Sequence, residues 1–465
     1  MEGRVVGIES YAVYIPAGRL QRAAIATALG SGRGRGARPV ASYDEDSTTL
    51  GVAAARRALG SRAITGSLWF ATSRPAYLEK SNAVTVAAAS GLGEEAPAYD
   101  VGGALRGGAG ALRAGLAEGS ALVVASDLRF GLPGSADEAD GSDAAAAFVV
   151  GADPVAELVA TASVTREFLD RWREPGDVRT RTWEDRFGVE EYLPLAGRAV
   201  EDVLARGDVA RDALAQVVVS TPHARARSQV ANSFPAEVTE LGSVAGAGYA
   251  GTADLGVGLV AAFERAKPGD LVLALSLADG ADAFLFRMTE RHQPGRSGLE
   301  TLDGPEAEVS YVDFLTWRGL LPREPARRPD VKPPVPPASR RTTDWKFGFV
   351  AGRCRECGYR NLPPRRVCLR CRASDAFEPE VMVDVPARVA TFTDDWLSES
   401  VQLPAKVVAV DFEGGGRFEF EMTDAAGHTP SIGDAVVPTF RVASVAGNGV
   451  RNYIWKVRPH REEDR

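Results

Sequence analysis

Cysteine is scarce in this chain, and its few positions exclude a good deal. Only four cysteines occur among 465 residues, and all of them lie between Cys354 and Cys371. A disulfide framework is therefore excluded for the rest of the chain. No cysteine outside this segment remains to act as a nucleophile.

Long apolar runs and an excess of positive charge are missing as well. No segment approaches the length of a membrane span, and the N-terminal residues lack the basic and then apolar pattern of a signal peptide. The formal net charge of −8 argues against bulk attraction to nucleic acid or to anionic membranes. Hydrophobic residues at 45% and charged residues at 25% are ordinary for a globular protein. We therefore expect a cytoplasmic protein of about two to four domains.

The first two thirds of the chain alternates strand-like and helix-like segments. Apolar runs predict strands at 68–73, 121–127 and 144–151. Ala-rich stretches predict helices at 48–60, 82–91 and 107–118. Such an alternation is typical of a layered α/β architecture.

The order of these segments is approximately repeated. In the first half, a helix is followed by ALVVASD and then by GSDAAAAFVVG, and in the second half a helix is followed by KPGDLVLALSL and then by DGADAFLFRM. Two copies of one α/β unit would account for about 320 residues. Coincidence among Ala- and Gly-rich segments is the alternative.

Composition also suggests boundaries between parts of the chain. Residues 166–200 are rich in Arg, Glu, Trp and Phe, which suits either a cap that excludes water from a site or a solvated surface insertion. Residues 322–341 contain a Pro-rich stretch, which predicts an extended and semi-rigid linker. The cysteine segment follows at 342–376. Short apolar runs separated by turn residues at 377–465 predict a small β-barrel of the OB-fold type.

The four cysteines form two C-x-x-C pairs, Cys354 with Cys357 and Cys368 with Cys371. The short spacing lets both sulfur atoms of a pair face one ion, and Gly358 permits the tight turn that such a knuckle requires. Four thiolates leave no position open on a tetrahedral zinc ion, so we predict a structural zinc ribbon. A redox pair or an iron site is the alternative.

Basic residues are abundant around these cysteines: Arg340, Arg341, Lys346, Arg353, Arg355, Arg360, Arg365, Arg366, Arg370 and Arg372. This surface is either simply solvated, or it binds phosphate groups such as those of coenzyme A, or it binds nucleic acid. The acidic balance of the whole chain makes nucleic acid the least favoured of the three.

Four segments carry a family resemblance: YDEDSTTLGVAAARRAL, TSRPAYLEKSNAVTVAAASGL, AKPGDLVLALSL and YVDFLTWRGLL. With them, residues 1–321 resemble the 3-hydroxy-3-methylglutaryl-CoA synthase branch of the thiolase superfamily in its archaeal-type form. Residues 342–462 resemble a small acyl-CoA-associated family with a rubredoxin-like zinc ribbon and an OB-fold. The resemblance implies a duplicated thiolase-type α-β-α-β-α domain, usually dimeric, followed by a zinc ribbon and a small OB-fold barrel.

The chemistry of the thiolase-like family requires four side chains. A Cys carries the acyl group, a His and an Asn bind and polarise the thioester, and a Glu acts as acid or base. The resemblance places Leu105 at the Cys, within YDVGGALRGG, and Ser220 at the His. It places Ala247 at the Asn and Glu45 at the Glu. The hydrocarbon side chain of Leu105 cannot attack a thioester.

Two further residues depend on how the second half is matched. The resemblance places Arg225 at a Lys that binds coenzyme A, and another register puts His223 at the catalytic His. His223 could equally be a loop histidine beside a strand. Glu45 could equally be an acid that is favourable at a helix N-terminus.

Three of the four catalytic residues are thus replaced. This predicts a non-catalytic or degenerate subunit of a multi-component acyl-CoA complex, paired with a catalytic thiolase-type protein for Claisen condensation, acyl transfer or retro-aldol chemistry. Structural zinc and a coenzyme A thioester are the expected ligands. One alternative is an autonomous acyltransferase or lyase that uses Glu45 and His223, because a retro-aldol step needs no acyl-enzyme. The other is an acyl-CoA or nucleic-acid binding module.

Overall fold

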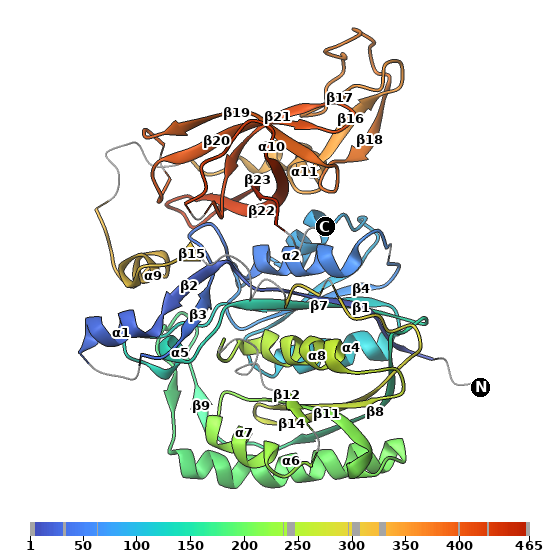
Figure 1. The fold of residues 1–465 in the computed structure, drawn as a ribbon, viewed down its shortest axis with the longest axis vertical. Helices are drawn as coiled ribbons and strands as arrows, with labels where there is room; N and C mark the ends of the chain where they lie inside the picture. The colour runs from blue at the N-terminus through green and yellow to red at the C-terminus, as the bar shows by residue number, and fades with distance from the viewer. Residues whose placement is uncertain are drawn as a thin grey trace. The chain divides into compact units, whose positions relative to one another are not determined.

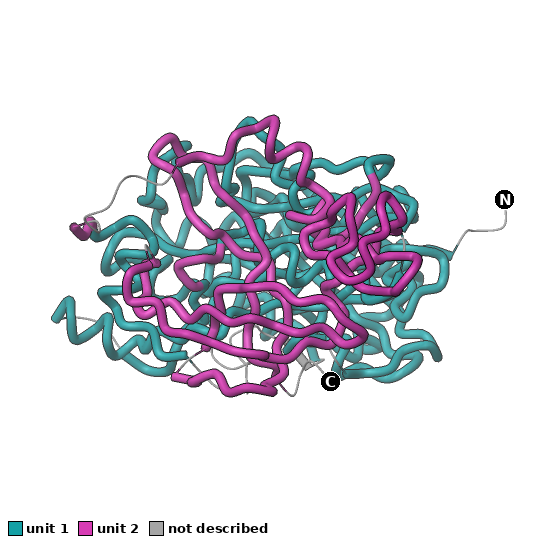
Figure 2. Tube along the Cα trace, turned by 90° about the horizontal axis from the view of Figure 1, so that it is seen from above, with its two compact units in different colours: residues 1–41, 46–86, 94–321 teal, residues 42–45, 87–93, 322–465 magenta. Residues whose placement is uncertain are grey.

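The computed structural model describes residues 5–30, 34–62, 64–235, 237–239, 247–295, 297–299, 307–324, 332–398, 400–425 and 427–461. The chain forms two compact units, which Figure 2 shows in different colours. Unit 1 comprises residues 1–41, 46–86 and 94–321, and unit 2 comprises residues 42–45, 87–93 and 322–465. Among the helices of the described residues, none is long and apolar enough to cross a membrane.

Ten strands of unit 1 form one continuous sheet in the order β12-β11-β13-β14-β8-β1-β7-β6-β4-β5. The strands of the first half are β1 (Gly7–Tyr14), β4 (Ser67–Thr72), β5 (Ala98–Gly102), β6 (Ala121–Asp127) and β7 (Ala144–Gly151). Those of the second half are β8 (Ala156–Thr165), β11 (Leu214–Ser220), β12 (Glu237–Thr239), β13 (Leu271–Leu277) and β14 (Gly280–Met288). The two halves meet where β1 pairs with β8.

The two halves of the sheet follow one pattern. From the centre outward, the first half runs β1, β7, β6, β4, β5, and the second runs β8, β14, β13, β11, β12. In each half the first two pairings are antiparallel and the last two are parallel. The predicted duplication of one α/β unit is therefore confirmed.

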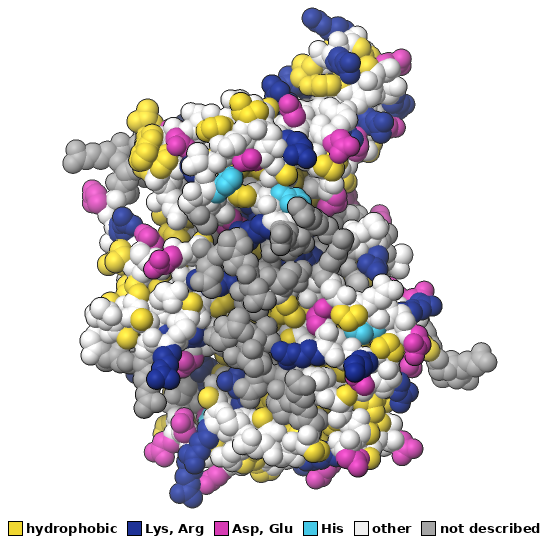
Figure 3. Space-filling view, in the orientation of Figure 1, with side chains coloured by type: hydrophobic (Ala, Val, Ile, Leu, Met, Phe, Trp, Pro, Cys, Tyr) yellow, Lys and Arg dark blue, Asp and Glu magenta, His cyan; other side chains and the backbone are white. Residues whose placement is uncertain are grey.

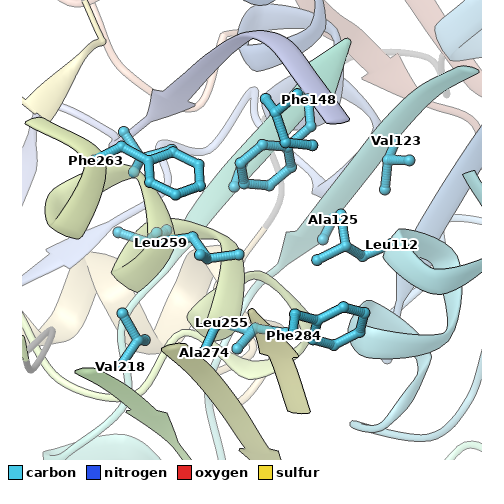
Figure 4. Packing of buried hydrophobic residues seen from close by; sticks show 14 of the residues in the cluster. Leu112, Val123, Ala125, Phe148, Val218, Leu255, Leu259, Phe263, Ala274 and Phe284 are labelled. Atoms are coloured by element: carbon cyan, nitrogen blue, oxygen red, sulfur yellow. The ribbon is translucent and has the colours of Figure 1, made fainter. Parts of the chain in front are cut away.

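Helices separate and cover these halves. In Figure 1, α4 (Gly107–Glu118) and α8 (Asp254–Arg265) form the central layer, while α2 (Ser47–Leu59) and α6 (Asp185–Gly207) cover the outer faces. This is the expected α-β-α-β-α order. Side chains from both halves meet at the central helices, as Figure 4 shows for Phe148, Phe284 and Leu259. Figure 4 also shows Leu112 of α4 on the same core.

The stretch expected as an insertion divides into two different structures. Its first part holds a two-stranded hairpin of β9 (Arg171–Trp172) and β10 (Arg181–Thr182). Residues 185–200 form the first part of α6, which packs Leu195, Ala199 and Val203 into a second core cluster.

The remaining elements of unit 1 are α1 (Arg22–Leu29), β2 (Gly18–Gln21), β3 (Ala37–Val40), α5 (Ala136–Ala139), α7 (Ala224–Ala231), β15 (Ala307–Glu308) and α9 (Tyr311–Trp317). The residues of α3 (Ala83–Ala89) are divided between unit 1 and unit 2.

Unit 2 combines a small ribbon with a closed five-stranded barrel. The ribbon is made of β16 (Val350–Cys354), β17 (Arg360–Asn361) and β18 (Phe377–Val381). The barrel runs in the order β19 (Ala387–Asp395), β20 (Ala405–Phe412), β21 (Arg417–Met422), β23 (Arg451–Pro459) and β22 (Ala435–Val445). Aromatic rings fill it: Phe349, for example, lies within 6 Å of the rings of Phe420 and Trp455. The small barrel expected for an OB-fold is thus present.

The predicted linker is only partly described. Residues 325–331 lie outside the described part of the chain. The end of the linker forms a short helix, α10 (Pro336–Arg341), which opens with two prolines at positions where a helix tolerates them. A second short helix, α11 (Thr343–Lys346), leads to the ribbon.

Candidate functional site: the region matched to an acyl-transfer centre and a zinc ribbon

The turn that precedes α4 carries the position of the expected nucleophile. Leu105 lies in this turn, half-buried, one residue before the N-cap Arg106. Asp100 holds the turn to α3, because its carboxylate accepts hydrogen bonds from the backbone N–H groups of Asn82 and Ala83 at 2.9 and 3.0 Å. The turn that is expected to carry the nucleophile is therefore anchored to α3, and Leu105 offers no nucleophilic atom there.

Arg106 reaches from this turn across to the second half of unit 1. It donates to the carboxylate of Asp282 at 2.7 Å and to the carbonyl oxygen of Asp279 at 2.9 Å. It also donates to three acceptors on β8: Ser163 Oγ, Thr165 Oγ1 and the Val164 carbonyl oxygen. Gly280 makes room for it, since a Cβ there would lie 2.6 Å from the guanidinium group. Arg106 could not be found from the sequence, because its partners lie at least 57 residues away along the chain.

Ser220 occupies the expected position of the catalytic His and is bonded to a buried acid. It ends β11, is buried, and its hydroxyl group hydrogen-bonds Asp254 at the start of α8. The other partner of Asp254 is the N–H group of Ala250, at 3.0 Å. Burial raises the pKa of Asp254 to about 6, although both hydrogen bonds oppose the shift. Asp254 was also missed, although an acid directly before the apolar run LGVGLVAAF is visible in the sequence.

Ala247 and the start of α4 belong to the same region of unit 1. Ala247 is 1% exposed, and its methyl group offers no hydrogen bond to a thioester. A few residues further on, the carbonyl oxygen of Thr252 packs so closely on Gly108 that a Cβ there would lie 2.1 Å away. The start of α4 and the turn that contains Ala247 thus belong to one core of unit 1.

His223 has no ring nitrogen left for proton transfer. It is the N-cap of α7: Nδ1 accepts from the N–H group of Ala226 at 3.1 Å, and Nε2 lies 3.0 Å from the carbonyl oxygen of Asp185. Because Nδ1 accepts a hydrogen bond, Nε2 is the nitrogen that can donate to the Asp185 carbonyl oxygen. Arg225, two residues later, is exposed on α7.

Glu45 belongs to unit 2, and its carboxylate is fully engaged there. One oxygen accepts from Arg441 of β22, and the other accepts from the N–H group of Ser42 at 2.8 Å. Arg441 is completely buried and also pairs with Asp424 at 2.6 Å. A general acid or base in this position would first have to leave its ion pair.

The four cysteines converge at one end of the ribbon. Their sulfur atoms all lie within 4.8 Å of one another, and the pairs Cys354–Cys371 and Cys357–Cys368 are 3.6 Å apart. A tetrahedral zinc ion with Zn–S bonds of about 2.3 Å requires S–S distances of about 3.8 Å, so the donor set fits zinc. With four protein ligands the ion would hold the ribbon together and leave no position for substrate.

The basic residues of the ribbon are partly neutralised. Arg360 pairs with Glu380 at 2.7 Å, and Arg366 pairs with Asp375 at 2.8 Å. Arg365, Arg366 and Arg372 line a shallow open hollow together with Val367, Cys368 and Leu369. On the face shown in Figure 3, basic and hydrophobic side chains lie next to each other at the far end of the ribbon.

Comparison with known proteins found a family match for the ribbon and relatives for about two thirds of the chain. Residues 348–378 match the family described as ChsH2, rubredoxin-like zinc ribbon domain. A hydroxymethylglutaryl-CoA synthase of Methanopyrus kandleri is 30% identical over 334 residues, which cover 66% of this chain and 95% of the relative.

Solved structures agree with the fold of unit 1. A crystal structure of HMG-CoA synthase complexed with CoA matches with a TM-score of 0.59 and 18% identity, over 67% of this chain and 89% of the other. The HMG synthase of the curacin biosynthetic pathway, in complex with an acetyl donor-ACP, matches with a TM-score of 0.56 and 16% identity, over 67% and 88% of the two chains. The chain belongs to the hydroxymethylglutaryl-CoA synthase family of the thiolase superfamily and carries a rubredoxin-like zinc ribbon and a small barrel in addition.

Proposed function

We propose that this chain is a non-catalytic subunit of a multi-component acyl-CoA complex. A thiolase-type partner would supply the catalytic cysteine for Claisen condensation, acyl transfer or retro-aldol chemistry. The observation that carries the proposal is Leu105 in the nucleophile turn of a family member, in a chain whose four cysteines all lie in the zinc ribbon.

The surroundings of the other positions support the same conclusion. Ser220 and Ala247 lack the imidazole and amide groups that would polarise a thioester. Glu45 is neutralised by Arg441, and both nitrogens of His223 are bonded to the backbone. An autonomous acyltransferase or lyase based on Glu45 and His223 is therefore less well supported than a subunit role.

The ligand of the complex is proposed to be a coenzyme A thioester. A solved structure of similar fold is described as complexed with CoA. The exposed Arg225 of α7 and the basic end of the ribbon are the residues of this chain that could contact its phosphate groups. We propose that the chain associates with itself or with the catalytic partner through its thiolase-like unit.

An assay of thiol release tests the absence of catalysis. The purified full chain should release no free coenzyme A from acetyl-CoA or acetoacetyl-CoA above the buffer rate, while a cysteine-containing synthase of the family serves as the positive control. Leu105→Cys should remain inactive, because Ser220 and Ala247 still cannot polarise the thioester. Release at an enzymatic rate by the unaltered chain would refute the proposal.

The native mass of the protein in its own host tests the partner. A tagged chain should purify with a second, thiolase-type chain that has an intact nucleophilic cysteine. The reconstituted pair should then release coenzyme A, and a Cys→Ala variant of the partner should abolish this activity. A stable homo-oligomer that gains no activity from such a partner would contradict the subunit role.

A further inference from the structure

Four arginines of unit 1 gather around Ser73: Arg74, Arg129, Arg171 and Arg173. Ser73 directly follows β4, and its carbonyl oxygen accepts a hydrogen bond from Arg173 at 2.8 Å. Nη1 of Arg129, which follows β6, lies 3.5 Å from the Ser73 hydroxyl oxygen. Arg171 and Arg173 come from the inserted β9–β10 hairpin and the residue after β9. The cluster therefore joins the insertion to the ends of the neighbouring strands β4 and β6.

One carboxylate serves two of these arginines. Asp137 is paired with Arg129 at 2.8 Å and with Arg171. These two guanidinium groups hold its pKa far below the usual range, against the effect of burial. Arg129 and Arg171 thus share a single negative charge.

The other acid of the cluster forms no ion pair with the remaining arginines. Among the described residues, the donors to Asp127 are all neutral: Thr72 Oγ1, Ser73 N, Ser73 Oγ and Thr252 N. Throughout the part of the chain that the structure describes, neither Arg74 nor Arg173 forms an ion pair with a carboxylate. The cluster contains four guanidinium groups and two carboxylates, so it has an excess of positive charge.

This excess lies in a partly desolvated place. Arg129 is 3% exposed, while Arg74 and Arg173 are half-buried and thus reachable from solvent. Nε of Arg74 and Nε of Arg129 are buried without a hydrogen-bond partner. Burial and the charges of Arg173 and Arg129 lower the pKa of Arg74 to about 9. Asp127 and Asp137 attract Arg74 and Arg173 without pairing with either of them. Four arginines in a partly desolvated place thus share two carboxylates, and an anion would relieve the cost of this imbalance.

The place in the fold is one where α/β proteins bind ligands. Ser73 and Arg129 follow the carboxyl ends of two neighbouring parallel strands, β4 and β6. Arg74 is held in position by stacking on Phe130, with its guanidinium carbon 3.9 Å from the ring centre, and by donating to the Phe130 carbonyl oxygen at 2.7 Å. Its charged group is therefore ordered before any ligand arrives.

We propose that this arginine cluster binds an anionic small molecule, whose carboxylate or phosphate group lies between Arg74 and Arg173. Guanidinium groups suit both anions, because their parallel N–H donors match pairs of carboxylate or phosphate oxygens. The site needs neither a nucleophile nor a catalytic partner. Binding of this ligand would therefore not depend on whether the chain transfers acyl groups.

Thermal denaturation of the full chain at constant ionic strength tests the site. After dialysis into chloride, inorganic phosphate and malonate are titrated separately, with chloride replaced to keep the ionic strength fixed. At least one of them should raise the melting temperature of unit 1 in a saturable manner, as expected for a ligand that binds only the folded form. The anion that saturates at the lower concentration identifies the preferred chemistry. The absence of a saturable rise with either anion would overturn the proposal.

Variants distinguish this site from other basic surfaces. Arg173→Gln and Arg74→Gln should each weaken anion binding by about tenfold or more, because each removes a charge-assisted hydrogen bond. Arg179→Gln is the matched control, since Arg179 is an exposed arginine of the same insertion, and it should leave binding unchanged. If Arg173→Gln fails to fold, Arg173→Lys retains the charge and should still weaken binding. Equal binding by the wild type and by Arg74→Gln would mean that the anion binds elsewhere, and would overturn the proposal.

Discussion

Arg441 faces three carboxylates inside unit 2. It is paired with Glu45 and with Asp424, and its Nε lies 4.0 Å from Asp44. Burial opposes ionisation of Asp424, but Arg441 and two further arginines hold its pKa below the usual range. The guanidinium group of Arg441 therefore compensates several buried carboxylates. One of these belongs to Glu45, the residue matched to the catalytic acid.

Replacing Arg441 by Met should destabilise unit 2 strongly. Breaking a buried ion pair from one side typically costs about 3–5 kcal/mol, because the partner charges remain buried and uncompensated. Arg417→Met is the matched control: Arg417 pairs with Asp411 on the surface of the barrel, with side chains 59% and 50% exposed. Such a pair contributes about 1 kcal/mol at most. Urea unfolding of both variants gives the comparison, and a loss no larger for Arg441→Met than for Arg417→Met would contradict the account.

Asp254 should make the stability of unit 1 depend on pH. The unfolded chain releases the Asp254 proton near pH 4 and the folded chain near pH 6, because burial raises the pKa to about 6. Between these values the folded form binds more protons, so its stability falls as the pH rises, by about 3 kcal/mol in total. Asp254→Asn should abolish this fall in melting temperature between pH 4 and 6. Asp212→Asn, at an exposed acid, should leave it in place, and an unchanged profile for Asp254→Asn would refute the assignment.

At the scale of elements, α4 shows how closely the two halves of unit 1 approach. Gly108 lies at the buried start of this helix, where a Cβ would meet the Thr252 carbonyl oxygen at 2.1 Å. Gly110, two residues later, is exposed, and a Cβ there would come no closer than 3.9 Å to Val101. The same residue type thus serves close packing at one position and has no such role at the other.

The substitutions Gly108→Ala and Gly110→Ala should have opposite effects. Gly108→Ala should lower the free energy of unfolding by about 1–3 kcal/mol, because the backbone of Thr252 must move away. Gly110→Ala should raise it by up to about 1 kcal/mol, because alanine is the better helix former. Denaturant unfolding measures both. A destabilisation by Gly110→Ala equal to that by Gly108→Ala would show that the close approach to Thr252 is not the cause.

Elements with a clear apolar pattern were predictable, and contacts between distant segments were not. The predicted helix at 107–118 and the predicted strands at 121–127 and 144–151 coincide with α4, β6 and β7. Cys354 and its partners were found because two C-x-x-C pairs close together in the sequence are typical of a metal site. Arg106 and Arg441 were not found, because a lone arginine carries no sign of partners 176 or 396 residues away.

At the scale of the whole molecule, the division into two units predicts separate responses to metal loss. Chelation should remove zinc from the four cysteines and unfold the ribbon, since such small metal sites fold with their ion. Unit 1 has its own core and should stay folded. Hydrogen exchange should therefore increase in β16–β18 on chelation and stay unchanged in β6 and β7. Loss of protection in both units at the same chelator concentration would contradict this.

Arg106 has a consequence for any attempt to place a nucleophile at position 105. Its five hydrogen bonds connect the loop that contains Leu105 to the second half of unit 1. The guanidinium group of Arg106 occupies the space that a Cβ of residue 280 would need, and Gly280 has none. A cysteine introduced at position 105 would lie in a loop whose next residue, Arg106, is anchored to the second half of unit 1. A nucleophile introduced at position 105 would therefore take the position that the anchored Arg106 gives this loop.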